Sequence, residues 1–219
     1  MQILVVAATR LEVAPLAAAF SCDTAAGQPL VTCAAAGHQV DVLIAGIGMV
    51  ATAAWCARAL AQRRYDFALN LGVCGTFDRS LPLGTVVHVV SDHLAELGAE
   101  DGEHFLTMHD LRLVADATFK NSSAPVNSII DRLPRVAGIT VNTVHGSDRS
   151  IAAIVQRLSP QVESMEGAAF MYACTINAVP FAQVRAISNV IEKRNRAAWN
   201  LPLAIGNLGE VAIAAIEGA

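Results

Sequence analysis

The sequence predicts a single domain over residues 1–219, a three-layer α/β/α fold with a mixed, mostly parallel central sheet. Short apolar runs alternate along the chain with alanine-rich segments of helical length, which is the pattern of strands covered by helices. Hydrophobic residues make up 54% of the chain but aromatic residues only 5%, so small and aliphatic side chains carry the excess. Buried parallel strands under alanine-rich helices account for both numbers.

The expected elements follow from these runs and from the glycine, polar and charged residues that end them. We expect strands over residues 2–8, 29–34, 39–45, 67–71, 83–90, 139–144 and 181–187. We expect helices over residues 10–20, 49–63, 164–177 and 203–217. The polar stretch 91–135 has mixed patterning, and we interpret it as an excursion at the rim of the site.

Charge and hydropathy limit the partners. A net charge of −4 argues against nucleic-acid or anionic-membrane binding through a basic face. No apolar run reaches the roughly 18 residues of a membrane span, and the start of the chain reads as a strand, not a signal peptide. The five cysteines form no CxxC pair and the histidines fit no metal spacing. We therefore expect reduced cysteines, a cytoplasmic protein, no metal and no catalytic histidine.

Glu166 is the most informative residue, because it is an acid at the start of an apolar helix rich in small residues. One interpretation is a first-turn acid stabilised by the helix dipole. A buried carboxylate is costly, however, unless a partner or a ligand uses it. Gly167 and its alanine neighbours allow close packing, and a carboxylate there suits two vicinal sugar hydroxyls.

The strand over residues 181–187 runs into Ser188-Asn189, which places polar groups where open α/β sheets bind ligands. Arg185 is expensive to bury alone, so we expect it to pair with a carboxylate, either at the site or as a structural ion pair. The charged loop that follows is either solvated surface or a lid. Its candidate ligand contacts are Arg194, Arg196 and Trp199.

Two glycine turns and one further acid complete the candidates. Residues 46–51 match a dinucleotide fingerprint, but Asp66 precedes its strand instead of ending it, so we do not expect NAD. Residues 72–75 predict a tight loop after a strand, with Gly75 near the ligand. Glu12 is either a first-turn acid, which spacing alone favours, or a general base for water.

In this order the segments resemble the nucleoside phosphorylase/nucleosidase superfamily over nearly the whole chain. The matching segments are Glu12, Gly46–Gly48, Asn70–Gly75, Ser164–Ala169 and Val184–Asn189. In that superfamily they correspond to the water-activating glutamate, two glycine loops, the Met-Glu ribose-binding helix and the base-reading strand. The resemblance implies the corresponding fold and an assembly of two or more copies.

Two departures narrow the expected reaction. Asn70 follows Leu69 where the phosphorolytic members carry a phosphate-binding arginine, which favours water as the nucleophile. Asn189 replaces the aspartate of adenine-specific members, and an amide offers the donor and acceptor that suit a 6-oxopurine edge. Within the superfamily the chain is most similar to the futalosine hydrolases, which release hypoxanthine from a nucleoside bearing a 5′ carboxyphenyl ketone.

The resemblance implies hydrolysis of a purine nucleoside without metal or cofactor. Glu12 would activate water, Glu166 with Met165 would hold the ribose, and Asn189 with Ser188 would stabilise the departing base. The other expected contacts are Gly75 and Arg185, with Arg194 or Arg196 on the carboxylate and Trp199 over the ring. Alternatives are a methylthioadenosine/adenosylhomocysteine nucleosidase, a purine nucleoside phosphorylase, a nucleoside-binding module and a nicotinamide-dependent oxidoreductase.

Overall fold

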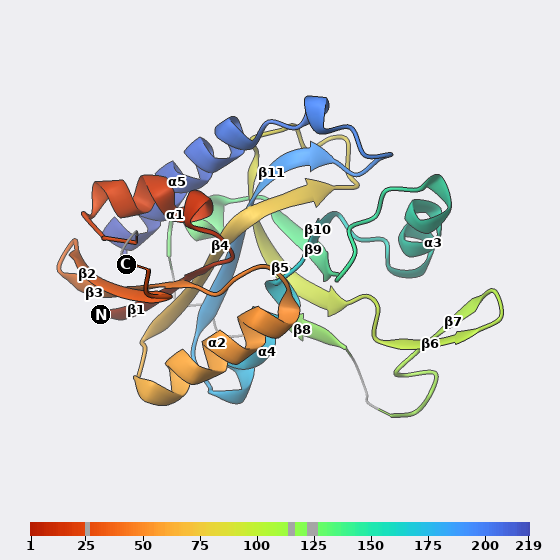
Figure 1. Ribbon diagram of the computed structural model, residues 1–219, viewed down its shortest axis with the longest axis horizontal. Helices are drawn as coiled ribbons and strands as arrows, with labels where there is room; N and C mark the ends of the chain where they lie inside the picture. Colours follow the sequence, from red (N-terminus) through yellow and green to blue (C-terminus); the bar gives the residue numbers. More distant parts are fainter. Residues whose placement is uncertain (25–26, 114–116, 122–126) are drawn as a thin grey trace.

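The computed structural model describes residues 1–24, 27–113, 117–121 and 127–219, and Figure 1 shows helices on both faces of a central sheet. The strands of this sheet are β1 (Gln2–Ala7), β2 (Leu30–Ala35), β3 (His38–Ile44), β4 (Phe67–Thr76), β5 (Val86–Leu94), β8 (Thr118–Lys120), β9 (Arg135–Thr140), β10 (Val162–Ser164) and β11 (Phe181–Val190). A separate hairpin consists of β6 (Gly98–Asp101) and β7 (His104–Thr107). The helices are α1 (Arg10–Ala19), α2 (Met49–Gln62), α3 (Asp148–Leu158), α4 (Gly167–Ile176) and α5 (Leu201–Glu217), with 3-10 turns η1 (Ile130–Arg132) and η2 (Arg196–Ala198).

The main sheet is mixed, as the sequence predicts. Its strand order is β10-β9-β5-β11-β4-β1-β3-β2, with β8 beside β5 and an additional pairing of β10 with β4. The central strands β3, β1, β4 and β11 run parallel to one another. Antiparallel pairs occur at the flanks, where β2 meets β3 and β5 meets β11. The parallel centre brings the carboxyl ends of β1, β4 and β11 to one edge.

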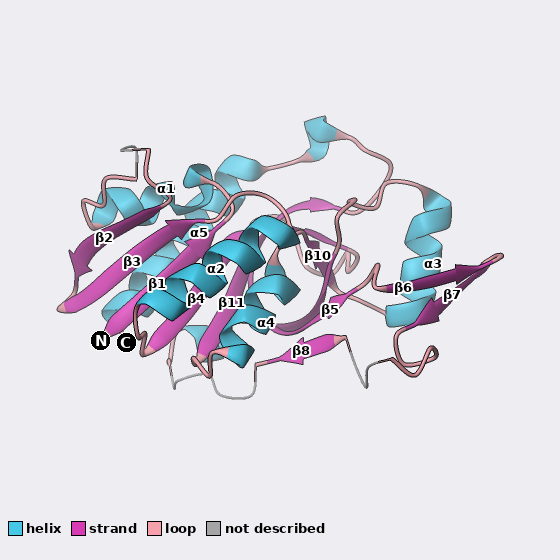
Figure 2. Ribbon diagram, turned by 60° about the horizontal axis from the view of Figure 1, so that its bottom comes forward, coloured by secondary structure: helices cyan, strands magenta, loops and turns pink. Residues whose placement is uncertain are grey.

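Two hydrophobic cores hold the layers together. Helices α1 and α5 cover one face, and α2 and α4 lie side by side on the other (Figure 2). Alternate residues of β1 serve the two cores, because successive side chains of a strand point to opposite faces: Val5 packs in the first and Leu4 in the second. Both are fully buried, which explains the continuous apolar sequence of this strand. The predicted three-layer α/β architecture is confirmed.

Several predicted boundaries are wrong near the site. Residues 72–75 are not a loop, because β4 continues to Thr76, where β11 and β10 supply its hydrogen-bonding partners. The predicted helix 164–177 begins only at Gly167, and residues 162–164 instead form β10, a buried strand between β9 and β4. Strand β11 runs three residues beyond the predicted end. Non-local pairing extends strands that local composition ends early.

Other differences concern residues 83–158. The strand expected over 83–90 is β5, which starts later and reaches Leu94, and the strand expected over 139–144 is β9, which ends at Thr140. Helix α3 was not predicted, although Ile151, Ile154, Val155 and Leu158 have helical spacing. The stretch 91–135 contains the end of β5, the hairpin, β8 and η1. Its segments 114–116 and 122–126 lie outside the described residues.

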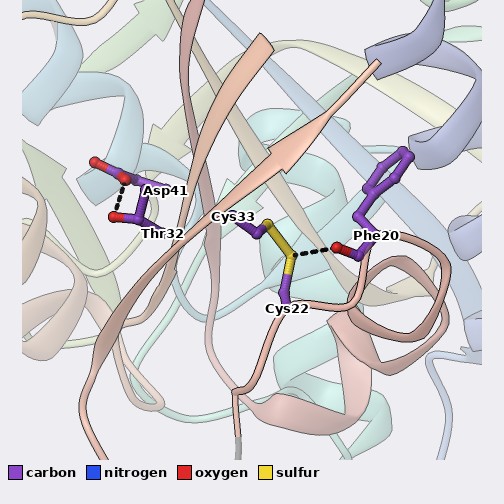
Figure 3. Close-up of a disulfide and its surroundings, with 5 residues drawn as sticks. All are labelled: Phe20, Cys22, Thr32, Cys33 and Asp41. Carbon is purple, nitrogen blue, oxygen red and sulfur yellow. Dashed lines mark hydrogen bonds between the residues drawn. A yellow bond between two sulfur atoms is a disulfide. The ribbon is translucent and has the colours of Figure 1, made fainter. Parts of the chain in front are cut away.

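The expectation that all cysteines are reduced is wrong for one pair. Cys22 and Cys33 form a disulfide with their Cα atoms 5.4 Å apart (Figure 3). Cys22 follows α1 and Cys33 lies on the edge strand β2, so the pairing depends on how this strand returns past the helix, which spacing does not reveal. The free cysteines in the described part of the chain, Cys56, Cys74 and Cys174, are buried. No helix among the described residues is long and apolar enough to cross a membrane.

Candidate active site

The neighbouring strands β4 and β11 position most of the candidate residues. They run parallel, with Arg185 in register with Gly72 and Asn189 in register with Gly75. The register shifts between Ile187 and Asn189, and such a bulge turns the side chains that follow it. Because each strand residue advances about 3.3 Å, the two register points lie roughly 10 Å apart. The strands therefore carry two groups of polar side chains in succession.

Glu12 is buried beside Gly72, the first of these two register points. Its Oε2 accepts hydrogen bonds from the backbone amide and the hydroxyl of Thr9, each at 2.9 Å, so it caps the start of α1. Its Oε1 accepts from the Val73 amide of β4 at 3.1 Å. The carboxylate thus has a structural function at the helix start and also reaches the edge of the sheet. The two interpretations of Glu12 are compatible.

Glu166 lies at the N-cap position of α4 and is buried. Its Oε1 accepts a hydrogen bond from the Gly48 amide at 3.1 Å, and its Oε2 lies 3.5 Å from Nη1 of Arg185. The glycine turn at residues 46–51 thus presents its amide to this carboxylate. Met165, beside it, is partly buried. Glu166 therefore joins the start of α2 to β11.

Arg185 is 1% exposed and is the partner of Glu166. Its Nη2 donates to Oδ1 of Asn70 at 2.6 Å, and its Nη1 pairs with Glu166. The carboxylate partner expected from its burial is present, and it is a candidate site residue. A Cβ at Gly72 would overlap Nη1 of Arg185 and lie 3.0 Å from Oε1 of Glu12. The glycine therefore leaves the space beside β4 that the Arg185 and Glu12 side chains occupy.

Asp92 of β5 is linked by hydrogen bonds to the start of α4 through Thr140. Its Oδ1 accepts from the Thr140 hydroxyl at 2.8 Å, and that hydroxyl oxygen accepts from the Ala168 amide at 2.7 Å. Its Oδ2 accepts from Nε2 of Gln183 at 2.9 Å. Burial raises the pKa of Asp92 to about 6, and the nearby charge of Glu166 adds to this, while these hydrogen bonds and Arg185 oppose it.

Substitution of Asp92 by Asn should change the pH dependence of stability. The raised pKa means that the folded state holds this proton to higher pH than the unfolded state, so stability falls as pH rises from about 4 to about 6. Asp92→Asn removes that fall, and Gln183 can turn its amide to accept from the new one. Each pKa unit is worth about 1.4 kcal/mol. Urea denaturation at pH 4.5 and 7 should show the variant gaining a few kcal/mol over the parent at the higher pH; parallel curves would contradict this.

Asn189 lies at the second point, in the wall of a cavity of about 140 Å³. Its Oδ1 accepts from the Ser188 hydroxyl at 2.9 Å, and its Nδ2 donates to the Val190 carbonyl at 3.1 Å. Gly75 allows this approach, because a Cβ there would lie 3.2 Å from Nδ2 of Asn189 and 2.7 Å from Cγ1 of Ile191. The amide is therefore fixed at the cavity wall.

The cavity combines predicted and unpredicted residues. Its lining consists of Gly75, Val144, His145, Gly146, Glu163, Asn189, Val190, Ile191, Glu192, Arg194, Asn195 and Trp199. The Arg194 guanidinium lies over the Trp199 ring, 5.5 Å from its centroid. Arg196, in η2, is not among these lining residues, nor are Glu12 and Glu166.

Sequence reasoning missed His145 and Glu163. His145 lies in the segment between β9 and α3, and no pattern in the sequence links it to an acid 18 residues later. Only the pairing of β10 with β4 brings Glu163 beside Gly75. The signal available was the acid itself, two residues before Met165-Glu166. Within the described ranges, no three His, Cys, Asp or Glu side chains gather as metal ligands would.

Comparison with known proteins identifies the family of the chain. A family model described as the phosphorylase superfamily matches residues 2–217. Futalosine hydrolase of Acidothermus cellulolyticus is 34% identical over 82% of this chain and 75% of its own length. Futalosine hydrolase of Streptomyces coelicolor is 30% identical over 95% of this chain and 92% of its own length. The solved 5′-methylthioadenosine/S-adenosylhomocysteine nucleosidase of Neisseria meningitidis, in complex with methylthio-immucillin-A, has a TM-score of 0.81 at 16% identity, covering 100% of this chain and 99% of its own.

Proposed function

The chain belongs to the phosphorylase superfamily and is an N-glycosyl hydrolase, and we propose that its substrate is futalosine, from which it releases hypoxanthine. The observation that carries the substrate proposal is Asn189, an amide in the wall of the cavity. A carboxylic acid at this position could protonate a departing adenine, whereas an amide can only donate and accept hydrogen bonds. The two futalosine hydrolases similar to this chain support the same substrate.

In our proposed mechanism the two parts of the substrate bind to different groups of polar side chains, one beside Gly72 and the other beside Gly75. The ribose would lie at Gly72, where Glu166 can accept hydrogen bonds from its hydroxyls and Met165 can pack against it. The purine would lie in the cavity, where Asn189 would stabilise the negative charge that develops on the departing base. Glu12 would take a proton from water as the water attacks the anomeric carbon. The bond between C1′ and the base nitrogen breaks, and the anionic base gains a proton from solvent to leave as hypoxanthine. The side chains of Glu12, Arg185 and Glu166 are held by protein contacts, so little reorganisation would accompany the reaction.

Water as the nucleophile is supported by Asn70. This residue stands where phosphorolytic members are expected to carry an arginine, and its Oδ1 accepts from Arg185 at 2.6 Å. Arg185 is in turn paired with Glu166, so its charge is already balanced. A phosphate here would have to compete with both partners for the same guanidinium.

The released base and its dependence on phosphate test the proposed function. The purified protein should be incubated with futalosine, inosine and methylthioadenosine in parallel, with and without phosphate, and the products identified by chromatography. We expect hypoxanthine from futalosine at a rate that phosphate does not change. Adenine from methylthioadenosine with futalosine left intact would instead identify a methylthioadenosine-type nucleosidase, and a strict need for phosphate would identify a phosphorylase.

The remaining proposals concern organisation. We propose that residues 1–219 form one nucleosidase domain, which the match over residues 2–217 supports. We also propose a homodimer or larger assembly. Apolar side chains are exposed at the start of α2 and on α4, which lie side by side: Ile47, Val50, Tyr172 and Ile176. Sedimentation velocity of the purified protein measures the assembly directly.

A further inference from the structure

His145 and Glu163 form a hydrogen-bonded pair in the cavity that Asn189 also lines. Glu163 is 4% exposed, and its Oε1 accepts a hydrogen bond from the His145 amide at 3.0 Å. Its Oε2 contacts Nδ1 of the His145 ring. Strand β10 places Glu163 in register with Gly75, and Gly75 is in register with Asn189. Glu163 and Asn189 therefore flank Gly75 from the two sides of β4, and the pair lines the same cavity as the amide proposed to bind the purine.

The contact with Glu163 fixes the hydrogen-bonding character of the ring. A carboxylate oxygen can only accept, so Nδ1 must carry the proton that lies between them. In the neutral ring Nε2 is then an acceptor. Among the described residues no hydrogen bond to Nε2 is present, and the ring is 14% exposed. Phe77 packs against its edge, with the ring centroids 6.2 Å apart. The neutral ring is thus oriented with one acceptor left for a ligand.

Asn189 supplies a hydrogen-bond donor, where His145 supplies an acceptor. If its amide were reversed, Oδ1 would face the Val190 carbonyl and two acceptors would meet, so the hydrogen-bond network selects the orientation with Nδ2 toward Val190. Oδ1 then faces the Ser188 hydroxyl, whose single hydrogen has two acceptors within reach, Oδ1 at 2.9 Å and the Cys74 carbonyl at 3.1 Å. The NH2 group of Asn189 has two hydrogens, of which the Val190 carbonyl takes one. The second is available to the cavity, so the wall offers a donor on Asn189 as well as the acceptor of His145.

We propose that His145, oriented by Glu163, is a specificity-determining residue that accepts a hydrogen bond from N1–H of a 6-oxopurine. This inference rests on the proposed function and assigns the residues that select its base. A 6-oxopurine has a donor at N1 beside an acceptor at O6, and a 6-aminopurine has the reverse arrangement. The acceptor of His145 and the donor of Asn189 match the first and oppose the second. A mismatched base leaves polar groups unpaired, which is the strongest form of discrimination available to such a site.

Binding of the free bases isolates this contact from turnover. Calorimetric titration should compare hypoxanthine, adenine and 1-deazahypoxanthine, in which a C–H replaces N1–H. For the parent we expect hypoxanthine to bind most tightly. His145→Phe should weaken hypoxanthine roughly 10- to 100-fold, while adenine and 1-deazahypoxanthine should bind as tightly as to the parent or more tightly, because the unmatched acceptor is gone. His145→Gln, whose side-chain oxygen is an acceptor, should restore part of the loss. His104→Phe, at an exposed histidine of β7, is the matched control and should change nothing.

Glu163→Gln provides a second test. It should change the affinities for hypoxanthine and adenine in opposite directions, which a general structural effect would not do. The side-chain oxygen of the new glutamine can still accept the hydrogen bond from the His145 backbone amide. Its NH2 group would then face Nδ1 of the ring and donate to it, so Nδ1 becomes the acceptor. The proton then moves to Nε2, which becomes a donor. Hypoxanthine should bind more weakly and adenine more tightly than to the parent.

The outcomes separate this inference from the proposed function. If His145→Phe weakens both bases equally, or neither, and Glu163→Gln does not shift the preference toward adenine, the inference is overturned while futalosine hydrolysis by the parent stands. If the parent neither hydrolyses futalosine or inosine nor prefers hypoxanthine, the proposed function itself fails and the inference fails with it.

Discussion

Glu12→Gln is expected to lower kcat for nucleoside hydrolysis by roughly 10²- to 10⁴-fold with little change in KM. A carboxylate can take the proton of an attacking water, whereas the amide of glutamine cannot. The Glu12 oxygens lie at the sheet edge beside Gly72 and the Val73 amide, where the ribose is proposed to bind. Steady-state kinetics with futalosine, or with inosine if it is turned over faster, measures the effect.

A structural effect of the same substitution must be separated from the chemical one. Three hydrogens point at the two carboxylate oxygens, from the Thr9 amide, the Thr9 hydroxyl and the Val73 amide. Glutamine has one oxygen, so at least one of these donors loses its acceptor, and we expect a loss of stability of about 1–3 kcal/mol. Thr9→Val is the matched control: it removes a capping hydrogen bond and leaves the carboxylate. If Glu12 is only a cap, both variants lower the melting temperature and neither lowers kcat at a temperature where both are folded.

The sequence was sufficient to place the residues of local motifs at one edge of the sheet. Glu12, Glu166 and Asn189 each follow or end an apolar run, and parallel strands present their carboxyl ends at one edge. That these three residues act on one substrate stays a prediction. Arg185 was predicted to need a carboxylate because an isolated buried charge is costly. These inferences use only properties that a few neighbouring residues determine.

What the sequence did not reveal depends on contacts between distant segments. Strand β10 is only three residues long, and its place between β9 and β4 brings Glu163 to the cavity. Such a short strand carries no periodicity, so the sequence predicts no strand here, and the helix expected over 164–177 includes its last residue, Ser164. In the sequence Asp92 is one more acid in a polar stretch. Only the fold shows that it is buried and holds Thr140 and Gln183 by hydrogen bonds. The disulfide of Cys22 likewise depends on the return of an edge strand.

Gly72→Ala is expected to have the second largest effect. A methyl group at this position overlaps Nη1 of Arg185 and approaches Oε1 of Glu12. Arg185 is held by Asn70 on its other nitrogen and by Glu166, so it has little room to retreat. We expect a loss of about 1–3 kcal/mol in the free energy of unfolding, together with a large loss of kcat/KM. Gly206→Ala, on the exposed side of α5 where a Cβ meets no atom within 4 Å, is the control and should be neutral or stabilising by up to about 1 kcal/mol.

A double-mutant cycle determines whether the overlap with Arg185 causes the loss. Arg185→Met removes the guanidinium and keeps an unbranched side chain, at the cost of leaving Glu166 without its cation. If the methyl group acts on the guanidinium, Gly72→Ala should destabilise the Arg185→Met protein much less than it destabilises the parent, because the atoms it displaces are already gone. Additive changes in urea denaturation would show that the alanine acts elsewhere, on Glu12 or on the β4 backbone. Activity should be lost in every member of the cycle except the parent. Gly72→Ala crowds Glu12 and Arg185→Met leaves Glu166 without its cation, and neither substitution restores what the other removes.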